Sequence, residues 1–69
     1  MEILAERLRL LREEKKLSQA EFAKAIGLST NGYQRYELDG RDPTAPVLVR
    51  IAEYYHVSAD YLLGLADTK

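Results

Sequence analysis

The sequence predicts an all-α domain of five short helices, and three observations lead to this fold class. Apolar residues recur at intervals of three and four along most of the 69 residues, which is the period of a helix with one buried face. Ser18, Ser29 and Ser58 each stand directly before such a stretch, where a helix N-cap is expected. Gly27 and Gly64 each stand directly after one, where a helix is expected to end.

The first helix is expected over Glu2–Lys15. Leu4, Leu8 and Leu11 lie at positions i, i+4 and i+7 of this segment and form its buried stripe. Leu10 lies off the stripe, so it is either an ordinary exposed apolar residue or part of a contact with a partner. One amphipathic helix therefore opens the domain and offers one face to the core.

The second helix follows the sequence SQAE, which is typical of a capping box. In such a box the Ser18 side chain accepts a hydrogen bond from the Glu21 amide, and the Glu21 carboxylate accepts one from the Ser18 amide. Gly27 is expected to end the helix, because it has no Cβ and adopts a left-handed conformation without strain. The buried face consists of Phe22, Ala23 and Ile26.

The third helix is expected to begin after Ser29 and to run to about Leu38. Tyr33 and Tyr36 lie three residues apart and are expected to face the core. The outward positions of its first two turns are Thr30, Asn31, Gln34 and Arg35. Two short helices joined by a tight turn predict a helix-turn-helix, the motif that lays its second helix in the major groove of DNA.

The last two helices follow a loop that contains Asp39, Gly40 and Pro43. Thr44 is expected to cap the fourth helix, and Pro46 is tolerated in its first turn. Its core positions are expected to be Leu48, Ile51, Ala52 and Tyr55. The fifth helix is expected to begin at Ser58, to bury Tyr61 and Leu62 and to end at Gly64. Residues 1–69 thus form one domain, with a frayed tail from about residue 65.

The segments RLRLLREEKKLSQAEFAKAIGLS, QRYELDGRDPT and LVRIAEYYHVSADYLLG occur in this order. From about Ile3 to Gly64 the chain resembles the Xre-like and Cro-like helix-turn-helix domains of bacterial and phage repressors. The resemblance implies a compact five-helix bundle of the lambda-repressor-like DNA-binding type with a central helix-turn-helix. It also implies a sequence-specific DNA-binding transcriptional regulator, most simply a repressor that reads an operator with the helix near residues 29–38.

The resemblance implies roles for individual side chains. Those that would contact base edges are Thr30, Asn31, Gln34 and Arg35. Their chemistry agrees, because Asn and Gln pair with adenine, Arg pairs with guanine, and the Thr methyl group contacts thymine. Gln19 would contact the DNA backbone. From their own chemistry, Ser18 and Ser29 are helix caps that become phosphate contacts if the backbone comes close, and Lys24 and Arg41 are either solubilising charges or phosphate contacts, with Arg41 the better candidate. Gln19 is also placed to brace a side chain of the recognition helix.

Two further sets of residues have structural roles in the family. Arg12 and Glu37 are expected to pair and to lock the recognition helix to the scaffold. A homodimer contact is expected at Tyr54, Tyr55, His56, Val57 and Ser58, with the Tyr54 ring free for the partner. Gly32 lies inside the third helix, where Gly costs about 1 kcal/mol relative to Ala, so it either permits close approach to DNA or occupies an exposed, unconstrained site.

The charge of the chain is unusual for a protein that binds double-stranded DNA. Ten Lys and Arg against eleven Asp and Glu give a formal net charge of −1. Residues 15–50 carry a small excess of two positive charges, so affinity would depend on dimerisation and specific contacts. The acidic balance supports a second reading, a helical protein-interaction module such as an antitoxin or a partner-sequestering regulator with weak DNA binding.

Composition argues against other classes of protein. The chain has no Cys, which excludes disulfides and thiolate metal sites and suits a reducing cytoplasm. No apolar run approaches the roughly 20 residues of a membrane span, so no membrane partner is expected. His56 is the single His and has neither ligand spacing nor a nucleophile nearby, so we expect no metal, no cofactor and no enzymatic activity.

Overall fold

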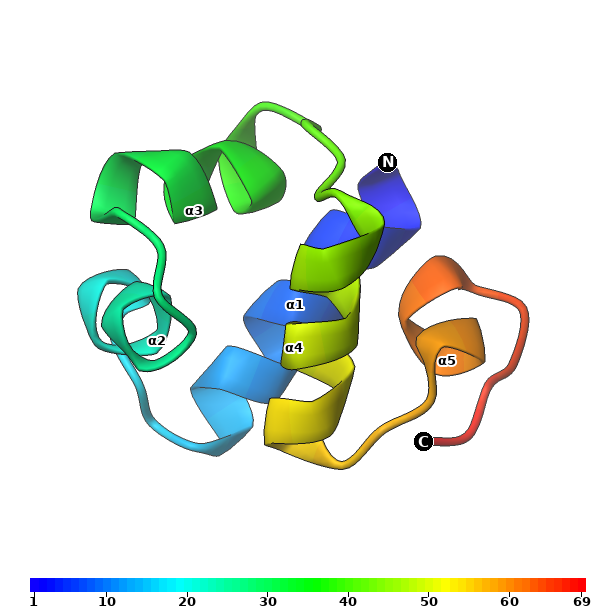
Figure 1. Cartoon of the computed structure of the whole chain (residues 1–69). Helices are drawn as coiled ribbons and strands as arrows, with labels where there is room; N and C mark the ends of the chain where they lie inside the picture. The colour runs from blue at the N-terminus through cyan, green and yellow to red at the C-terminus, as the bar shows by residue number, and fades with distance from the viewer.

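The computed structural model describes all 69 residues and contains five helices and no strand, so the predicted all-α class is confirmed. The helices are α1 (Glu2–Glu14), α2 (Gln19–Ala25), α3 (Thr30–Leu38), α4 (Ala45–Tyr55) and α5 (Ala59–Leu63). In Figure 1, α1 and α4 cross the middle of the molecule, α2 and α3 lie together on one side, and α5 lies on the other. The domain measures 28 × 22 × 20 Å.

Each of the five helices contributes one large, fully buried side chain to a single core. These side chains are Leu8, Phe22, Tyr33, Ile51 and Leu62. Burial of such side chains is the main favourable term that a chain of this size has available. Because α3 contributes Tyr33, the helix that carries the candidate site is part of the core and is not a loose attachment.

The turn between α2 and α3 is determined by local sequence. The predicted capping box is confirmed: Ser18 Oγ accepts from the Glu21 amide at 3.0 Å, and Glu21 Oε1 accepts from the Ser18 amide at 2.8 Å. Gly27 has a φ of +78°, which a residue with a Cβ adopts only with strain. Ser29 Oγ then accepts from the Gly32 amide at 3.0 Å and caps α3.

Two expectations for α4 need correction. Val47 is buried in the core although the sequence pattern placed Leu48 there, and Leu48 is only partly buried beside it. The reason is the phase of the helix, since Val47, Ile51 and Tyr55 recur every four residues on its buried side. Thr44 occupies the N-cap position, but its side chain makes no capping hydrogen bond.

An aromatic cluster joins α2, α3 and α4. The Phe22 ring packs edge-on against Tyr33, with centroids 5.1 Å apart, and stacks on Tyr55 with centroids 4.8 Å apart. Tyr54 also packs edge-on against Phe22 at 5.1 Å and is 36% exposed. The expectation that its ring is free is therefore wrong in part, because one side of the ring completes this cluster.

The Tyr55 hydroxyl is buried without a hydrogen-bond partner in the protein, and burial raises the pKa of this phenol. Replacing Tyr55→Phe keeps the stacked ring and removes the unpaired group. We expect the free energy of unfolding to rise by about 1 kcal/mol, measured by urea denaturation. Tyr33→Phe is the matched control and should instead destabilise the domain, because the Tyr33 hydroxyl donates to Glu37. A loss of stability in Tyr55→Phe would show that its hydroxyl has a partner in solution.

Candidate nucleic-acid interface

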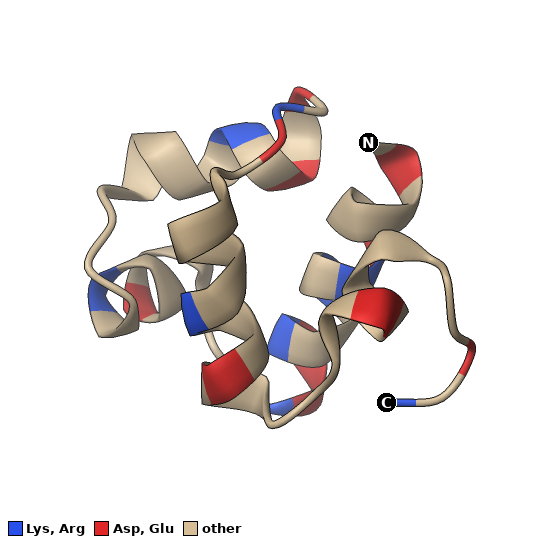
Figure 2. Cartoon of the chain, turned by 45° about the vertical axis from the view of Figure 1, so that its right-hand side comes forward, with Lys and Arg blue, Asp and Glu red and all other residues tan.

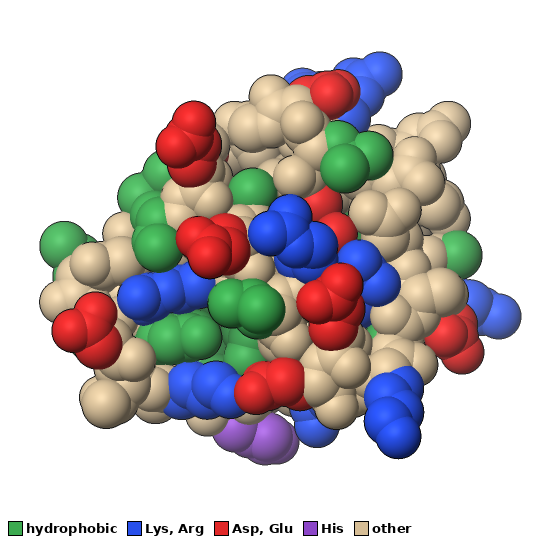
Figure 3. All heavy atoms as spheres, turned by 180° about the vertical axis from the view of Figure 1, so that it is seen from behind, with side chains coloured by type: hydrophobic (Ala, Val, Ile, Leu, Met, Phe, Trp, Pro, Cys, Tyr) green, Lys and Arg blue, Asp and Glu red, His purple; other side chains and the backbone are tan.

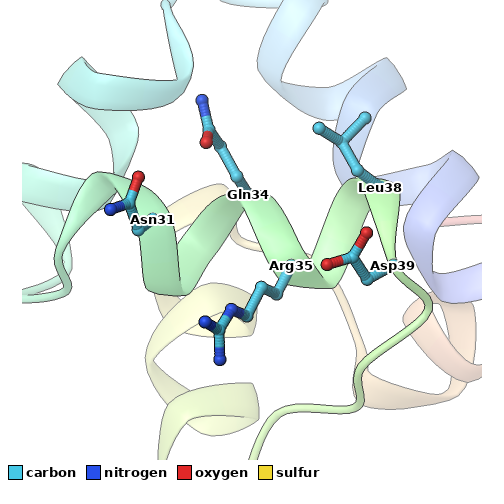
Figure 4. A pocket seen from close by; sticks show the side chains of 5 residues that line it. All are labelled: Asn31, Gln34, Arg35, Leu38 and Asp39. Atoms are coloured by element: carbon cyan, nitrogen blue, oxygen red, sulfur yellow. The ribbon is translucent and has the colours of Figure 1, made fainter.

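The outward face of α3 contains a shallow hollow, the one pocket of the domain. Its lining consists of Asn31, Gln34, Arg35, Leu38 and Asp39. In Figure 4 these five side chains lie along α3, and Gln34 and Arg35 extend from the helix in opposite directions. Three of the four residues expected to contact bases therefore lie together, and the fourth, Thr30, lies half-buried in the first turn outside the hollow.

Leu38 is a member of this surface that the sequence analysis missed. Its side chain is 69% exposed, so it adds apolar surface beside the polar groups of α3. It follows Asn31, Gln34 and Arg35 at the helical spacings i+7, i+4 and i+3. The signal was present in the sequence, since extending the outward face by one turn leads to residue 38.

On its buried side, α3 is fixed by an ion pair between Arg12 and Glu37. Arg12 Nε donates to Glu37 Oε2 at 2.8 Å, and Arg12 Nη2 donates to Glu37 Oε1 at 3.1 Å. Arg12 Nη1 also donates to the Leu17 carbonyl at 2.8 Å, in the connection between α1 and α2. Glu37 is 6% exposed and is the one charged residue in the buried set. This pair joins α1 to α3.

Burial alone would raise the pKa of Glu37, but hydrogen bonds from Arg12, Tyr33 and Gln19 outweigh it and hold the pKa below its usual value. The hydrogen bond to Glu37 likewise raises the pKa of Arg12 above its usual value. Both groups are therefore charged at neutral pH. A buried pair of this kind contributes more to a single arrangement of the helices than to net stability.

A line of hydrogen bonds runs from this pair to the surface. Gln19 Nε2 donates to Glu37 Oε1 at 3.2 Å, and Gln34 Nε2 donates to Gln19 Oε1 at 3.0 Å. Gln19 stands at the first turn of α2 and Gln34 in the middle of α3, so these bonds bridge the two helices of the motif. The expected brace between Gln19 and a recognition side chain is present, with Gln34 as that side chain.

The residues expected at phosphates surround α3. Ser18 and Ser29 are exposed at the N-termini of α2 and α3, and each side-chain oxygen already accepts a capping hydrogen bond. Lys24 and Arg41 are exposed, and the Arg41 amide donates to the Arg35 carbonyl at 3.1 Å, which ties the loop to α3. Arg50 is not one of these residues, and its guanidinium is already engaged, because it donates to the Ile26 carbonyl at 2.9 Å at the end of α2.

Acidic and basic groups are interspersed over the surface. Figure 2 shows Lys or Arg on α3 and on the loop after it, next to acidic positions. The face opposite that of Figure 1 carries both signs of charge around apolar side chains (Figure 3). In the space-filling view of this face, no large field of a single sign is visible.

The residues expected at a dimer contact differ in how much surface they offer. Tyr55 is 7% exposed and belongs to the core, so its ring is not available on this surface. Val57 packs partly against the core, whereas Ser58 is exposed and caps α5. His56 is exposed and ends α4 in a left-handed conformation, with a φ of +55°. The available surface is thus the open edge of Tyr54 together with the turn that follows α4.

The structure contains neither a candidate metal site nor a candidate membrane span. No three His, Asp or Glu residues lie together in an arrangement that could hold a metal ion. None of the helices has the length and apolar character needed to cross a membrane.

Comparison with known proteins identifies the family. A family model described as helix-turn-helix matches residues 8–62. The chain belongs to the Xre- and Cro-like helix-turn-helix family. This is a family of DNA-binding transcriptional regulator domains and not a class of enzymes.

Several members of the family are similar to the chain over most of its length. The uncharacterized HTH-type transcriptional regulator YobD of Bacillus subtilis (strain 168) is 42% identical over 62 residues, or 90% of this chain and 55% of YobD. The cryptic phage CTXphi transcriptional repressor RstR of Vibrio cholerae is 38% identical over 61 residues, or 88% of this chain and 54% of RstR. The chain thus spans about half the length of these two relatives and of the similar HTH-type transcriptional regulator ImmR of Bacillus subtilis.

A solved structure supports the same assignment. The DNA-binding domain of the P22 C2 repressor matches 96% of this chain and 90% of its own, with a TM-score of 0.79 and 29% sequence identity. The lambda-repressor-like bundle with a central helix-turn-helix is therefore confirmed. Within this fold, Arg12 and Glu37 join the first helix of the bundle to the recognition helix.

The ion pair gives a stability prediction. Arg12→Ala or Glu37→Ala should each lower the free energy of unfolding by about 3 to 5 kcal/mol, because the remaining charge stays buried without its partner. Arg12→Met combined with Glu37→Leu should recover most of this loss, but not all, since the Tyr33 hydroxyl loses its acceptor. Chemical denaturation of the two single variants and the double variant measures the coupling, and additive effects would contradict the pair.

The same pair predicts a dependence of stability on pH. The pKa of Glu37 is lower in the folded state than the usual value for a glutamate, so the carboxylate stabilises the fold at and above neutral pH. This contribution should disappear as the pH falls below about 4.5 and through the folded-state pKa. Thermal unfolding between pH 3 and 7 measures it, and the double variant should show a flatter profile than the wild type in the same range.

Proposed function

We propose that this domain is a sequence-specific DNA-binding transcriptional regulator that represses by occupying an operator. It would act in the bacterial cytoplasm, with α3 in the major groove. One observation carries the proposal: the second helix of a helix-turn-helix presents a polar, exposed face while its other side is locked by Glu37 and Tyr33 in the core. A rigid helix with outward hydrogen-bonding groups is what base readout requires.

The base-reading surface comprises Thr30, Asn31, Gln34 and Arg35, to which we add Leu38. Arg35 is exposed and has no ion-pair partner, so its guanidinium is available to guanine O6 and N7. Asn31 and Gln34 match the donor and acceptor of adenine. Leu38 offers an apolar surface of the kind that contacts the methyl group of thymine. Phosphates would be held by Ser18, Gln19, Lys24, Ser29 and Arg41, including the amides at the starts of α2 and α3.

A homodimer on a two-fold symmetric site completes the proposal. The contact would use the open edge of Tyr54 with His56, Val57 and Ser58, while Tyr55 supports this surface from the core. With a net charge of −1, a single domain gains little from phosphate attraction, and two half-sites would double its specific contacts. Two-fold symmetry would set the recognition helices about 34 Å apart on one face of the duplex.

The acidic balance favours one alternative, a helical module that binds another protein and DNA only weakly, such as an antitoxin. Besides Met1 and Tyr54, the large apolar side chains exposed outside α3 are Leu10, Val49 and Leu65. They lie on α1, on α4 and after α5. The DNA-binding proposal remains the better supported one, because its residues form one surface and the family is one of DNA-binding regulators.

Selection of bound sites from a random pool of duplex DNA tests the proposal. We expect one enriched sequence with approximate two-fold symmetry, half-sites one helical turn apart, and two protein chains per DNA in sedimentation. An asymmetric site bound by one chain would reject the dimer. A pool that shows no enrichment would reject sequence-specific binding and favour the protein-interaction alternative.

Arg35→Ala should lower affinity for the selected site by about 1 to 3 kcal/mol and relax the preference at one base pair. Arg41→Ala is the matched control and should weaken all sequences alike, reducing the slope of log K against log salt by about one. Titrations of the selected and a random duplex at several salt concentrations distinguish the two roles. Equal losses on both duplexes for Arg35→Ala would place it among the phosphate contacts.

A further inference from the structure

The hollow on α3 contains one acidic side chain, that of Asp39. It lines this surface together with Asn31, Gln34, Arg35 and Leu38, and it is exposed. The proposed base-reading surface includes the other four residues and leaves Asp39 without a role. Because DNA phosphates repel a carboxylate, an acidic group at this place needs an explanation of its own.

The backbone at Asp39 is held in place, whereas the carboxylate is available to a ligand. The amides of Asp39 and Arg41 both donate to the Arg35 carbonyl at 3.1 Å, which closes the end of α3. The ion pairs of the domain engage other acidic groups, namely those of Glu14, Glu37, Asp42 and Asp67. The Asp39 carboxylate can therefore accept hydrogen bonds from outside the domain.

Asn31, Arg35 and Asp39 follow one another at intervals of four residues, so they form a row along the exposed side of α3. In Figure 4 the Asp39 carboxylate is turned back along the helix toward Arg35. Four residues advance a helix by about 6 Å, and successive bases lie about 3.4 Å apart along a DNA strand. With Arg35 at one base pair, Asp39 would face a base about one or two pairs away.

The chemistry of a carboxylate limits the bases that it can contact. It accepts hydrogen bonds and donates none. Cytosine presents its N4 amino group in the major groove, whereas thymine presents O4 and guanine presents O6 and N7, which are all acceptors. Adenine has an N6 amino group but presents the acceptor N7 beside it. Cytosine is therefore the base that best matches the Asp39 side chain.

We propose that Asp39 is a specificity-determining residue, whose carboxylate accepts a hydrogen bond from the N4 amino group of a cytosine near the base pair read by Arg35. This inference rests on the proposed function, since it requires α3 to lie in the major groove. On DNA without this cytosine the carboxylate gains no hydrogen bond and still repels phosphates within about 8 Å, the screening length at physiological salt. Asp39 thus favours the correct site and disfavours other sequences.

Asp39→Asn tests the role, because Asn keeps the shape of the side chain and adds a donor that the acceptors of thymine and guanine tolerate. The variant and the wild type are titrated with the selected site, its single-base variants and a random duplex. Affinity for the selected site should fall about fivefold or more, and the preference for cytosine should be lost at one position. Affinity for the random duplex should instead rise, because one repulsive charge is removed.

Asp60→Asn is the matched control. It makes the same change in net charge on α5, which lies on the other side of the molecule from α3 (Figure 1). It should leave the base preference unchanged at every position of the site. The thermal unfolding of both variants should resemble that of the wild type, because both side chains are exposed.

Three results with Asp39→Asn would overturn the inference alone. The first is an unchanged base preference at every position of the site. The second is a rise in affinity by the same factor for the selected and the random duplex, which would place Asp39 beside phosphates only. The third is a loss of preference confined to the position that Arg35→Ala relaxes. A pool without any enriched site would overturn the proposed function and this inference with it.

A change in the DNA tests the same contact with the wild-type protein. The cytosine at the position assigned to Asp39 is replaced by 2-pyrimidinone, which lacks the 4-amino group. Wild-type affinity should fall about fivefold or more, whereas Asp39→Ala should bind the two duplexes almost equally. Equal binding of the two duplexes by the wild type would overturn the inference, whether or not the variants fold.

Discussion

The saturated carboxylate of Glu37 is the constraint on which the rest of the structure depends. Two nitrogens of Arg12, the Gln19 amide and the Tyr33 hydroxyl all donate to its two oxygens. A carboxylate has about four lone-pair sites, so this group has no capacity left. The donors come from α1, α2 and α3, and a buried charge tolerates no arrangement of these helices that leaves it unpaired. The position of the polar face of α3 is therefore fixed by a group that is itself buried.

The apolar core supports the same helix from other directions. Phe22 contacts both Tyr33 of α3 and Tyr55 of α4, so one ring ties the recognition helix to the centre of the bundle.

On the far side, Arg7 donates to the carbonyls of Tyr61 and Ala66 and lies 4.2 Å from the centre of the Tyr61 ring. A core of this size gives the fold little excess stability. The directional contacts of the buried aromatic and guanidinium groups help to fix how the helices pack.

Local chemistry explains what the sequence could predict. The caps at Ser18 and Ser29 and the turn at Gly27 depend on neighbours within four residues, and all three appear as expected. The choice of Val47 over Leu48 depends on the phase of α4 against other helices, which a local pattern does not contain. The bond between Gln19 and Gln34 likewise depends on how α2 and α3 approach each other, 15 residues apart in the chain. Tertiary packing thus decided what the sequence pattern left open.

The formal net charge gives a poor description of the surface that faces a ligand. Glu37 and Arg12 neutralise each other inside the protein, and Glu21 is engaged at the cap of α2. Arg50 is engaged at the end of α2 by the Ile26 carbonyl. What remains around α3 are Lys24, Arg35 and Arg41, against Asp39 at the end of the helix, since Asp42 pairs with the Met1 amino group at 2.9 Å. With so small a balance of charge, the proposed recognition of DNA depends on hydrogen-bond donors and acceptors that the fold holds in place. The hydrogen bonds from Gln19 to Glu37 and from Gln34 to Gln19 hold two of these side chains.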